Sequence, residues 1–228
     1  MPLHSAIIMY KITVSEEIRE KCPQYRGAAV YAQVKNTTYD QGLWDEINRF
    51  TEQLRTTETT ESIKQQPAIV ATRDAYRACG KDPSRYRPSA EALRRRLLRG
   101  LELYRIDTLV DLINLVSLRT GYSIGGFDAD KIVGTDLCLG IGREGEPFEG
   151  IGRGPLNIEC MPVIRDAEGG IGTPTSDHER TKMDINTTHI LAIINGYSGE
   201  EGLQEAAAMT AALLQRYATA TECNVWIF

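Results

Sequence analysis

Apolar residues recur every three or four positions in several stretches of the chain, which is the spacing of a helix with one buried face. On this ground helices are predicted at residues 41–54, 67–79, 90–99, 107–120 and 200–217. A further short helix is expected directly after Ser15, because two glutamates follow that serine and Pro23 ends the segment.

Residues that begin or end helices flank these stretches. Pro67 suits a first helical turn, and the side chains of Ser89 and Asp107 can each accept a backbone N–H as N-caps. Glycines that can end the preceding helices stand at Gly80, Gly100 and Gly121. Two capped helices therefore lead into a glycine-rich stretch, predicted as a turn, Gly125-Gly126-Phe127-Asp128.

The pattern changes after Asp130 to alternating apolar and polar residues separated by glycine-rich turns, which favours strands. Strands are predicted at residues 28–34, 132–141, 158–164, 189–194 and 224–228, with a hairpin turn at 166–170. Helices dominate the first half of the chain and strands the second. The sequence therefore predicts an α+β fold with layered, mixed β-sheets and flanking helices, in a single domain spanning residues 1–228.

Composition narrows the class of protein. The chain has 228 residues, 42% hydrophobic and 25% charged, which is ordinary for a globular domain with a real core. A net charge of -5 argues against nonspecific binding of nucleic acid by the whole surface, but it allows a local basic face. The five cysteines show no paired spacing, so free thiols are expected rather than a disulfide framework or a metal site.

No targeting or membrane segment is expected either. The first residues lack the basic start and the small-residue cleavage site of a secretory signal. The apolar runs are much shorter than the ~20 residues that cross a bilayer. The sequence thus predicts a soluble, cytoplasmic protein.

Residues 85–99 hold the densest positive cluster of an otherwise acidic chain. Leu93, Leu97 and Leu98 should anchor this helix inward, so most of its guanidinium groups are expected to point outward. Arginine there could bind RNA phosphates, and the alternative is a solvated face paired with nearby acids. The candidate RNA-binding residues are Arg85, Arg87, Arg94, Arg95, Arg96 and Arg99.

Two short stretches carry candidate site chemistry. Gly125 and Gly126 would let a ligand approach the backbone closely, and Asp128 could hold an amino group, although an ordinary turn explains the same residues. Residues 176–181 place a histidine beside carboxylates and hydroxyls that could activate or position a water. Neighbours in an extended segment point in opposite directions, so a catalytic triad does not follow, and a polar loop is the alternative.

Several of these motifs resemble the tRNA-editing domain of the phenylalanyl-tRNA synthetase beta subunit, which is built from the subunit's third and fourth B modules. The matching stretches are Lys81-Asp82-Pro83, residues 87–93, residues 110–114 with Ser117, and residues 125–132. The likeness continues through residues 145–148 to Thr181 and covers roughly 28–194, with the helix and strand of residues 200–228 packed on it. It implies layered sheets with helices on one side.

The resemblance also implies a function. That domain binds the 3′ end of a charged tRNA and hydrolyses tyrosine wrongly attached to phenylalanine tRNA, without a metal or cofactor. Two positions depart from the bacterial pattern Gly-x-x-Met-His-Ala-Phe-Asp and its partner glutamate. The histidine is replaced by Gly125, and the glutamate falls at about Ile193. Bacterial-type editing therefore cannot be transferred residue by residue.

Two functions remain open from the sequence. The first is a free-standing aminoacyl-tRNA deacylase that acts in trans on tRNA or aminoacyl-tRNA, with no cofactor and with its catalytic residues unassigned. The second is a non-catalytic module that binds an amino acid or an aminoacyl-adenosine. The chain is not expected to ligate phenylalanine by itself. The candidate pocket residues are Asn114, Ser117, Gly125, Gly126, Asp128, Ser176, Asp177 and Thr181.

Overall fold

A computed structural model describes residues 10–228 of the chain. Most of the N-terminal stretch considered as a secretory signal lies outside these residues. The helices are α1 (Glu16–Lys21), α2 (Gln41–Thr57), α3 (Thr60–Ile63), α4 (Pro67–Cys79), α5 (Ser89–Leu98), α6 (Thr108–Thr120) and α7 (Leu203–Tyr217), with the 3-10 turns η1 (Ala129–Lys131) and η2 (Glu179–Thr181).

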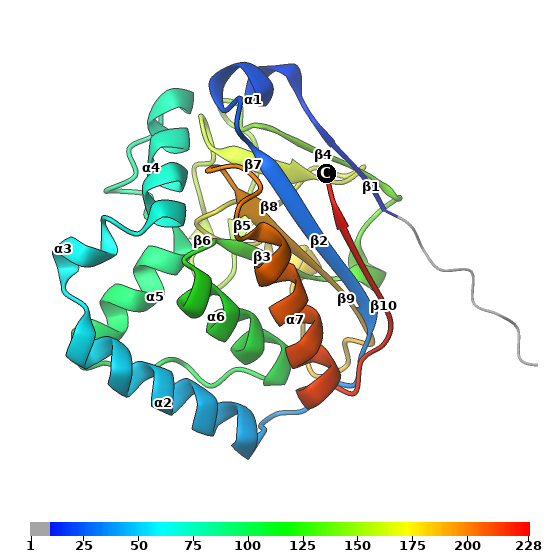
Figure 1. The fold of residues 1–228 in the computed structure, drawn as a ribbon. Coiled ribbons are helices and arrows are strands. Elements are labelled where there is room, and N and C mark those ends of the chain that lie inside the picture. The colour runs from blue at the N-terminus through cyan, green and yellow to red at the C-terminus, as the bar shows by residue number, and fades with distance from the viewer. Residues whose placement is uncertain (1–9) are drawn as a thin grey trace, which may run out of the picture.

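Two four-stranded sheets form the centre of the protein, and both lie on the same side of the large helices (Figure 1). The main sheet is antiparallel, in the order β10 (Thr221–Ile227), β2 (Arg26–Gln33), β9 (His189–Gly196), β3 (Ile124–Asp128). The second sheet has the order β1 (Lys11–Val14), β4 (Asp136–Ile141), β7 (Pro162–Arg165), β8 (Gly170–Gly172), and its β1 and β4 are parallel. A small hairpin joins β5 (Glu149–Gly150) to β6 (Gly154–Pro155).

The alternation of side chains along the main sheet separates two hydrophobic cores. In β2, Val30 packs on the side of α2, α6 and α7, whereas its neighbour Tyr31 packs toward the second sheet. In β9, Ile194 and Ile193 divide in the same way. Because successive residues of a strand point to opposite faces, one sheet can serve both cores. The result is the α+β architecture of layered, mixed sheets with flanking helices that the sequence predicts.

The predicted helix ends are mostly formed by the expected residues. Asp107 Oδ1 accepts the N–H of Val110 at 2.9 Å, and Gly121 ends α6 with a φ of 80°. Ser15 caps α1 in the same manner. Ser89 is different: it is the first residue of α5, Pro88 takes the cap position, and no side chain caps this helix.

Three predicted segments need correction. Gly125-Gly126-Phe127-Asp128 is not a turn but part of β3, which pairs with β9 through its whole length. The strand expected at 132–141 begins at Asp136, because η1 and a turn precede it. The strand expected at 158–164 begins at Pro162, after Cys160 has taken a φ of 60° that interrupts an extended backbone.

Candidate functional site

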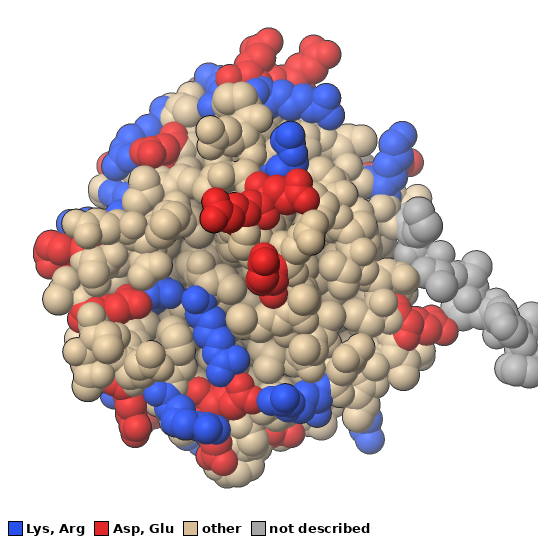
Figure 2. Space-filling model, viewed as in Figure 1, with Lys and Arg blue, Asp and Glu red and all other residues tan. Residues whose placement is uncertain are grey.

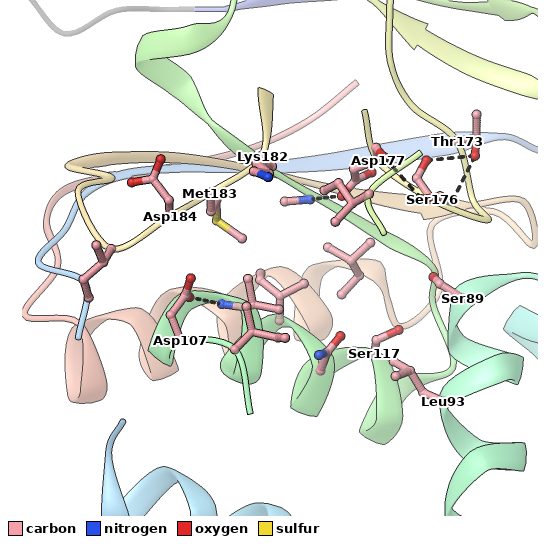
Figure 3. A pocket seen from close by; sticks show the side chains of 18 of the residues that line it. Ser89, Leu93, Asp107, Ser117, Thr173, Ser176, Asp177, Lys182, Met183 and Asp184 are labelled. Carbon is pink, nitrogen blue, oxygen red and sulfur yellow. Dashed lines mark hydrogen bonds between the residues drawn. The ribbon is translucent and has the colours of Figure 1, made fainter. Parts of the chain in front are cut away.

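A cavity of about 500 Å³ lies between α6, β3 and the segment from Thr173 to Ile185 (Figure 3). The start of α5 closes one end of it, through Ser89 and Leu93. The walls are mainly aliphatic, contributed by Val110, Ile113, Ile124, Met183 and Ile185 among others. A concave, mostly apolar site with a few convergent polar groups is the usual form of a small-molecule site, and the volume lies in the usual range.

The polar groups come from two opposite walls. On α6, Asn114 and Ser117 lie one turn apart, so both face the cavity. Ser117 Oγ donates to the carbonyl oxygen of Tyr122 at 2.6 Å, which fixes its orientation. Across from α6, Ser176 and Asp177 enter from the extended segment that follows β8 (Figure 3).

Asp177 is the most unusual group of the site. Its Oδ2 accepts the backbone N–H of Gly126 at 3.0 Å, and no Lys, Arg or His forms an ion pair with it within residues 10–228. Burial raises the pKa of Asp177 to about 7, because the hydrogen bond from Gly126 only partly offsets the loss of water around the carboxylate. At neutral pH this carboxyl is therefore divided between its acid and its ionised form.

Glycines make the room that this carboxyl occupies. A Cβ added at Gly172 would lie 2.9 Å from Asp177 Oδ1, and one added at Gly125 would lie 3.3 Å from it. β3 is also the last strand of its sheet, so the N–H of Gly126 is free to bond Asp177 rather than a neighbouring strand. The glycine pair of β3 thus supports the site from the backbone.

Five of the eight residues proposed from the sequence line the cavity, namely Asn114, Ser117, Gly126, Ser176 and Asp177. The other three do not. Thr181 is fully buried and does not line the cavity. Gly125 faces the space between the two sheets. Asp128 is used structurally: its Oδ2 accepts from Thr187 Oγ1 at 2.8 Å and forms an ion pair with Lys131 at 3.2 Å.

The two positions that depart from the bacterial pattern are direct neighbours. Gly125 and Ile193 are paired across β3 and β9. Ile193 is fully buried, and a Cβ at Gly125 would lie 2.6 Å from the ring of Phe127. Both residues, together with Asp177, border a very small second cavity of about 10 Å³. A compact apolar contact therefore replaces the polar pair, and Asp177 lies between it and the large cavity.

His178 is not placed as a base for this site. Its ring packs edge-on against Phe148, with the ring centres 4.9 Å apart, and its Nδ1 accepts the N–H of Arg180 at 2.9 Å. Burial and the neighbouring Arg180 lower the pKa of His178. The histidine does not line the cavity, and of residues 176–181 only Ser176 and Asp177 do so.

Sequence reasoning missed several residues of the site. Lys182, Met183 and Asp184 directly follow the predicted cluster and line the cavity, and Ile106 lines it from the loop before α6. The signal for Lys182 and Asp184 was present, since they continue the same polar run. Ile106 carried no signal of its own, because a single apolar residue in a loop is common.

The arginine cluster is divided between the interior and the surface. Arg94 was expected to point outward, but it is buried and binds Glu58 and the carbonyl oxygen of Leu118. Arg94 shares a helical face with Ala90, Glu91 and Leu97, and this is the buried face of α5. Arg94 is therefore removed from the candidate RNA-binding residues.

Two further arginines of the cluster bind a buried acid. Glu91 is fully buried and pairs with Arg95 at 2.7 Å, Arg87 at 3.5 Å and Arg73 at 2.8 Å. Elsewhere charges of both signs alternate on the face shown in Figure 2, without an extended patch of one sign. The ion-paired alternative thus describes Arg87 and Arg95, while Arg85, Arg96 and Arg99 form no ion pair within the described part of the chain.

Two further features are absent from residues 10–228. No three His, Cys, Asp or Glu side chains lie close enough to hold a metal ion. No helix is long and apolar enough to cross a membrane.

The chain is similar to a protein family, to two ligase subunits and to a solved structure. A family model described as the B3/4 domain matches residues 71–218. The phenylalanine–tRNA ligase beta subunit of Bartonella henselae is 35% identical over 98 residues, and that of Bartonella quintana is 34% identical over 96 residues. Each alignment covers 41% of this chain but 12% of the relative, so the chain spans only a small part of those ligase subunits.

A solved structure is also similar. The N-terminal fragment of the phenylalanyl-tRNA synthetase beta subunit from Pyrococcus horikoshii aligns with a TM-score of 0.47 and 16% sequence identity. That alignment covers 95% of this chain and 51% of the fragment.

Proposed function

Since the chain belongs to the B3/4 domain family, we propose that its cavity receives the aminoacyl end of a charged tRNA and that the protein hydrolyses this ester in trans. The observation that carries the proposal is a partly buried carboxyl, Asp177, which lines a mainly aliphatic cavity and has a pKa raised to about 7 by its loss of water. A hydrolase of this kind would work where charged tRNA is found, in the cytoplasm.

The proposed reaction uses Asp177 as a general base. Its ionised form accepts a proton from a water that attacks the ester carbonyl, and a pKa near the working pH suits this role. The carbon–oxygen bond of the ester then breaks, and the proton passes to the departing ribose oxygen. The aliphatic walls formed by residues such as Val110 and Ile113 hold the amino-acid side chain.

One observation favours a second function, a non-catalytic module that binds an amino acid or an aminoacyl-adenosine. The polar pair of the bacterial pattern is replaced by Gly125 and Ile193, whose side-chain positions are filled by apolar contacts. In such a module the ionised Asp177 would hold the α-ammonium group of the ligand. The cavity itself would be used in the same way.

The test of the hydrolase is the rate of ester loss from tyrosyl-tRNA and phenylalanyl-tRNA, each charged on phenylalanine tRNA. We expect the purified protein to accelerate loss of at least one ester, and Asp177→Asn to reduce this rate about 10²- to 10⁴-fold, the usual contribution of a general base. Asp45→Asn is the matched control, because Asp45 is an exposed carboxylate of α2 away from the cavity lining.

Binding without turnover identifies the second function. Thermal melting with phenylalanine, tyrosine or a non-hydrolysable aminoacyl-adenosine analogue should show a rise in Tm that Asp177→Asn removes. If both esters are lost only at the uncatalysed rate while such a shift is present, the protein is a binding module. If neither turnover nor a shift occurs, both functions are wrong.

A further inference from the structure

The segment from Arg96 to Ile106 exposes an unusual set of side chains beside the cavity. Tyr104 is 67% exposed, Ile106 is 56% exposed and Leu101 is 48% exposed. Its three arginines, Arg96, Arg99 and Arg105, form no ion pair with a carboxylate within the described residues, although the protein is acidic overall. Exposed aromatic rings next to unpaired cations indicate a surface that binds something anionic with flat, apolar groups.

Tyr104 is held in place by Arg96. The guanidinium carbon of Arg96 lies 3.9 Å from the centre of the Tyr104 ring, and its Nη1 donates to the tyrosine hydroxyl at 3.2 Å. The Nε of Arg96 donates to the carbonyl oxygen of Glu102 at 2.6 Å, which fixes the guanidinium itself. The ring is therefore oriented before any ligand arrives, and most of it remains open to solvent.

A second aromatic group is built around Arg105. Its guanidinium carbon lies 4.7 Å from the ring of Trp44 and 5.6 Å from the ring of Tyr39. Trp44 is buried, but Tyr39 is 39% exposed. This arginine thus connects a fixed ring in the core to a ring on the surface.

Both groups adjoin residues that line the cavity. Ile106 lines the cavity and stands two residues after Tyr104, so their Cα atoms are at most ~7 Å apart. Thr38 also lines the cavity and directly precedes Tyr39. Ile106 is 56% exposed while it lines the cavity, so the cavity has an opening, or mouth, on this side. A chain that leaves the cavity by this mouth passes close to these rings.

We infer that Tyr104 and Tyr39, backed by Arg96 and Arg105, form a stacking platform for unpaired RNA bases next to the aminoacyl end. The inference rests on the proposed function, because that function supplies an RNA end at this mouth. Aromatic rings stack on any base, and the arginines contribute phosphate contacts and cation–π contacts. The combination of exposed rings and unpaired arginines matches the flat bases and the charged backbone of a single strand of RNA.

The test is the affinity for a short, single-stranded RNA with a fluorescent 5′ end, measured by fluorescence anisotropy. Tyr104→Ala should weaken binding about 5- to 100-fold, since stacking of one base is lost. Tyr104→Phe keeps the ring and should bind within about twofold of the unchanged protein. Thermal melting of each variant establishes that the surface substitution leaves the fold intact.

A second measurement tests the arginines. Arg105→Ala should reduce the slope of log affinity against log salt by about 0.7, the value for one phosphate contact to a single strand. Arg19→Ala, at an exposed position of α1, is the control and should leave the slope unchanged.

The outcomes separate the platform from the proposed function. Equal RNA affinity for Tyr104→Ala, Tyr39→Ala and the unchanged protein, or no RNA binding at all, overturns the platform. A change of oligomeric state in Tyr104→Ala, without a change in RNA affinity, assigns the surface to protein contacts instead. Failure of the proposed function is seen separately, in ester hydrolysis and in the thermal shift with amino-acid ligands, neither of which depends on stacking of free RNA.

Discussion

At the scale of single residues, the site depends on a partly buried carboxyl whose ionised form is disfavoured by loss of water. Asp177 has one hydrogen bond, from the N–H of Gly126, and its pKa is raised from 3.8 to about 7. The folded state therefore keeps a proton that the unfolded chain releases well below pH 7. Stability is fully present below the unfolded pKa and is lost as the pH rises toward the folded pKa.

This gives a prediction for Asp177→Asn, which keeps the shape of the side chain but cannot ionise. The difference in the free energy of unfolding between this variant and the unchanged protein should shift in favour of the variant by about 2 kcal/mol between pH 5 and pH 8. The unchanged protein loses stability over this range because its aspartate must either keep a proton or ionise in a site that disfavours the charge, whereas asparagine does neither. Urea unfolding at several pH values measures this. A constant difference across that range would show that the carboxyl is not buried as described.

A second residue-scale prediction concerns Gly125. Gly125→Ala should lower the free energy of unfolding by about 1–3 kcal/mol, because the new Cβ would lie 2.6 Å from the Phe127 ring. Gly42→Ala is the milder comparison, since Gly42 lies in the exposed first turn of α2, where alanine is the better helix former, and its new Cβ would come no closer than 3.3 Å to Asp40 and Tyr217. Equal losses for the two variants in urea would contradict the close packing of β3.

At the scale of elements, α5 is attached to the protein through charge as well as through leucines. Its fully buried Glu91 binds the guanidinium groups of Arg73, Arg87 and Arg95, and its buried Arg94 binds Glu58. Replacing a buried acid that pairs with several cations by an uncharged residue is strongly destabilising, because the cations are left without a compensating charge. This helix also supplies Leu93 to the cavity.

Glu91→Gln should accordingly destabilise the protein by about 2–4 kcal/mol, less than the largest losses at buried pairs because the arginines retain some contact with water. The exposed Glu102 forms no ion pair within the described residues, so Glu102→Gln should change the free energy of unfolding by less than about 0.5 kcal/mol. Denaturant midpoints of both variants provide the comparison. Similar midpoints would mean that the Glu91 cluster adds nothing.

At the scale of the whole molecule, the main sheet is covered on both faces, by helices on one side and by the second sheet on the other (Figure 1). Ile193 lies in the core between the sheets and is fully buried, with Gly125 beside it. The core cluster that contains Ile193 is made of apolar and aromatic side chains and includes no lysine or arginine that could pair with a carboxylate at that position. The two departures from the bacterial pattern, Gly125 and Ile193, are therefore packed against each other and belong to one apolar contact rather than to two separate sites.

Restoring the polar residue alone should fail for this reason. Ile193→Glu places an unpaired carboxyl in an apolar core and should prevent stable folding or cost more than about 4 kcal/mol. Ile193→Val removes one methylene and should cost about 0.5–1.5 kcal/mol. Circular dichroism and urea unfolding distinguish the two, and a stable Ile193→Glu protein would show that the core between the sheets can admit water.

The sequence by itself determined the features that depend on near neighbours along the chain. Helix periodicity and end residues located α4 and α6 closely, since a helix and its caps are made by residues three or four positions apart. A short continuous apolar run located β9, and the general α+β class followed from the order of these elements. The motifs of α5, α6 and β3 were sufficient for the family resemblance.

Features that depend on contacts between distant segments were decided only by the tertiary structure. The glycines of β3 favour a turn by themselves, and they form a strand because β9 pairs with them and Phe127 and Met183 fill the space of their missing side chains. Asp177 and Gly126 are hydrogen-bonded although they are 51 positions apart in the sequence, so neither residue by itself indicates the site. Local patterns specify backbone shape, whereas a cavity and its buried charge exist only after remote segments have excluded water together.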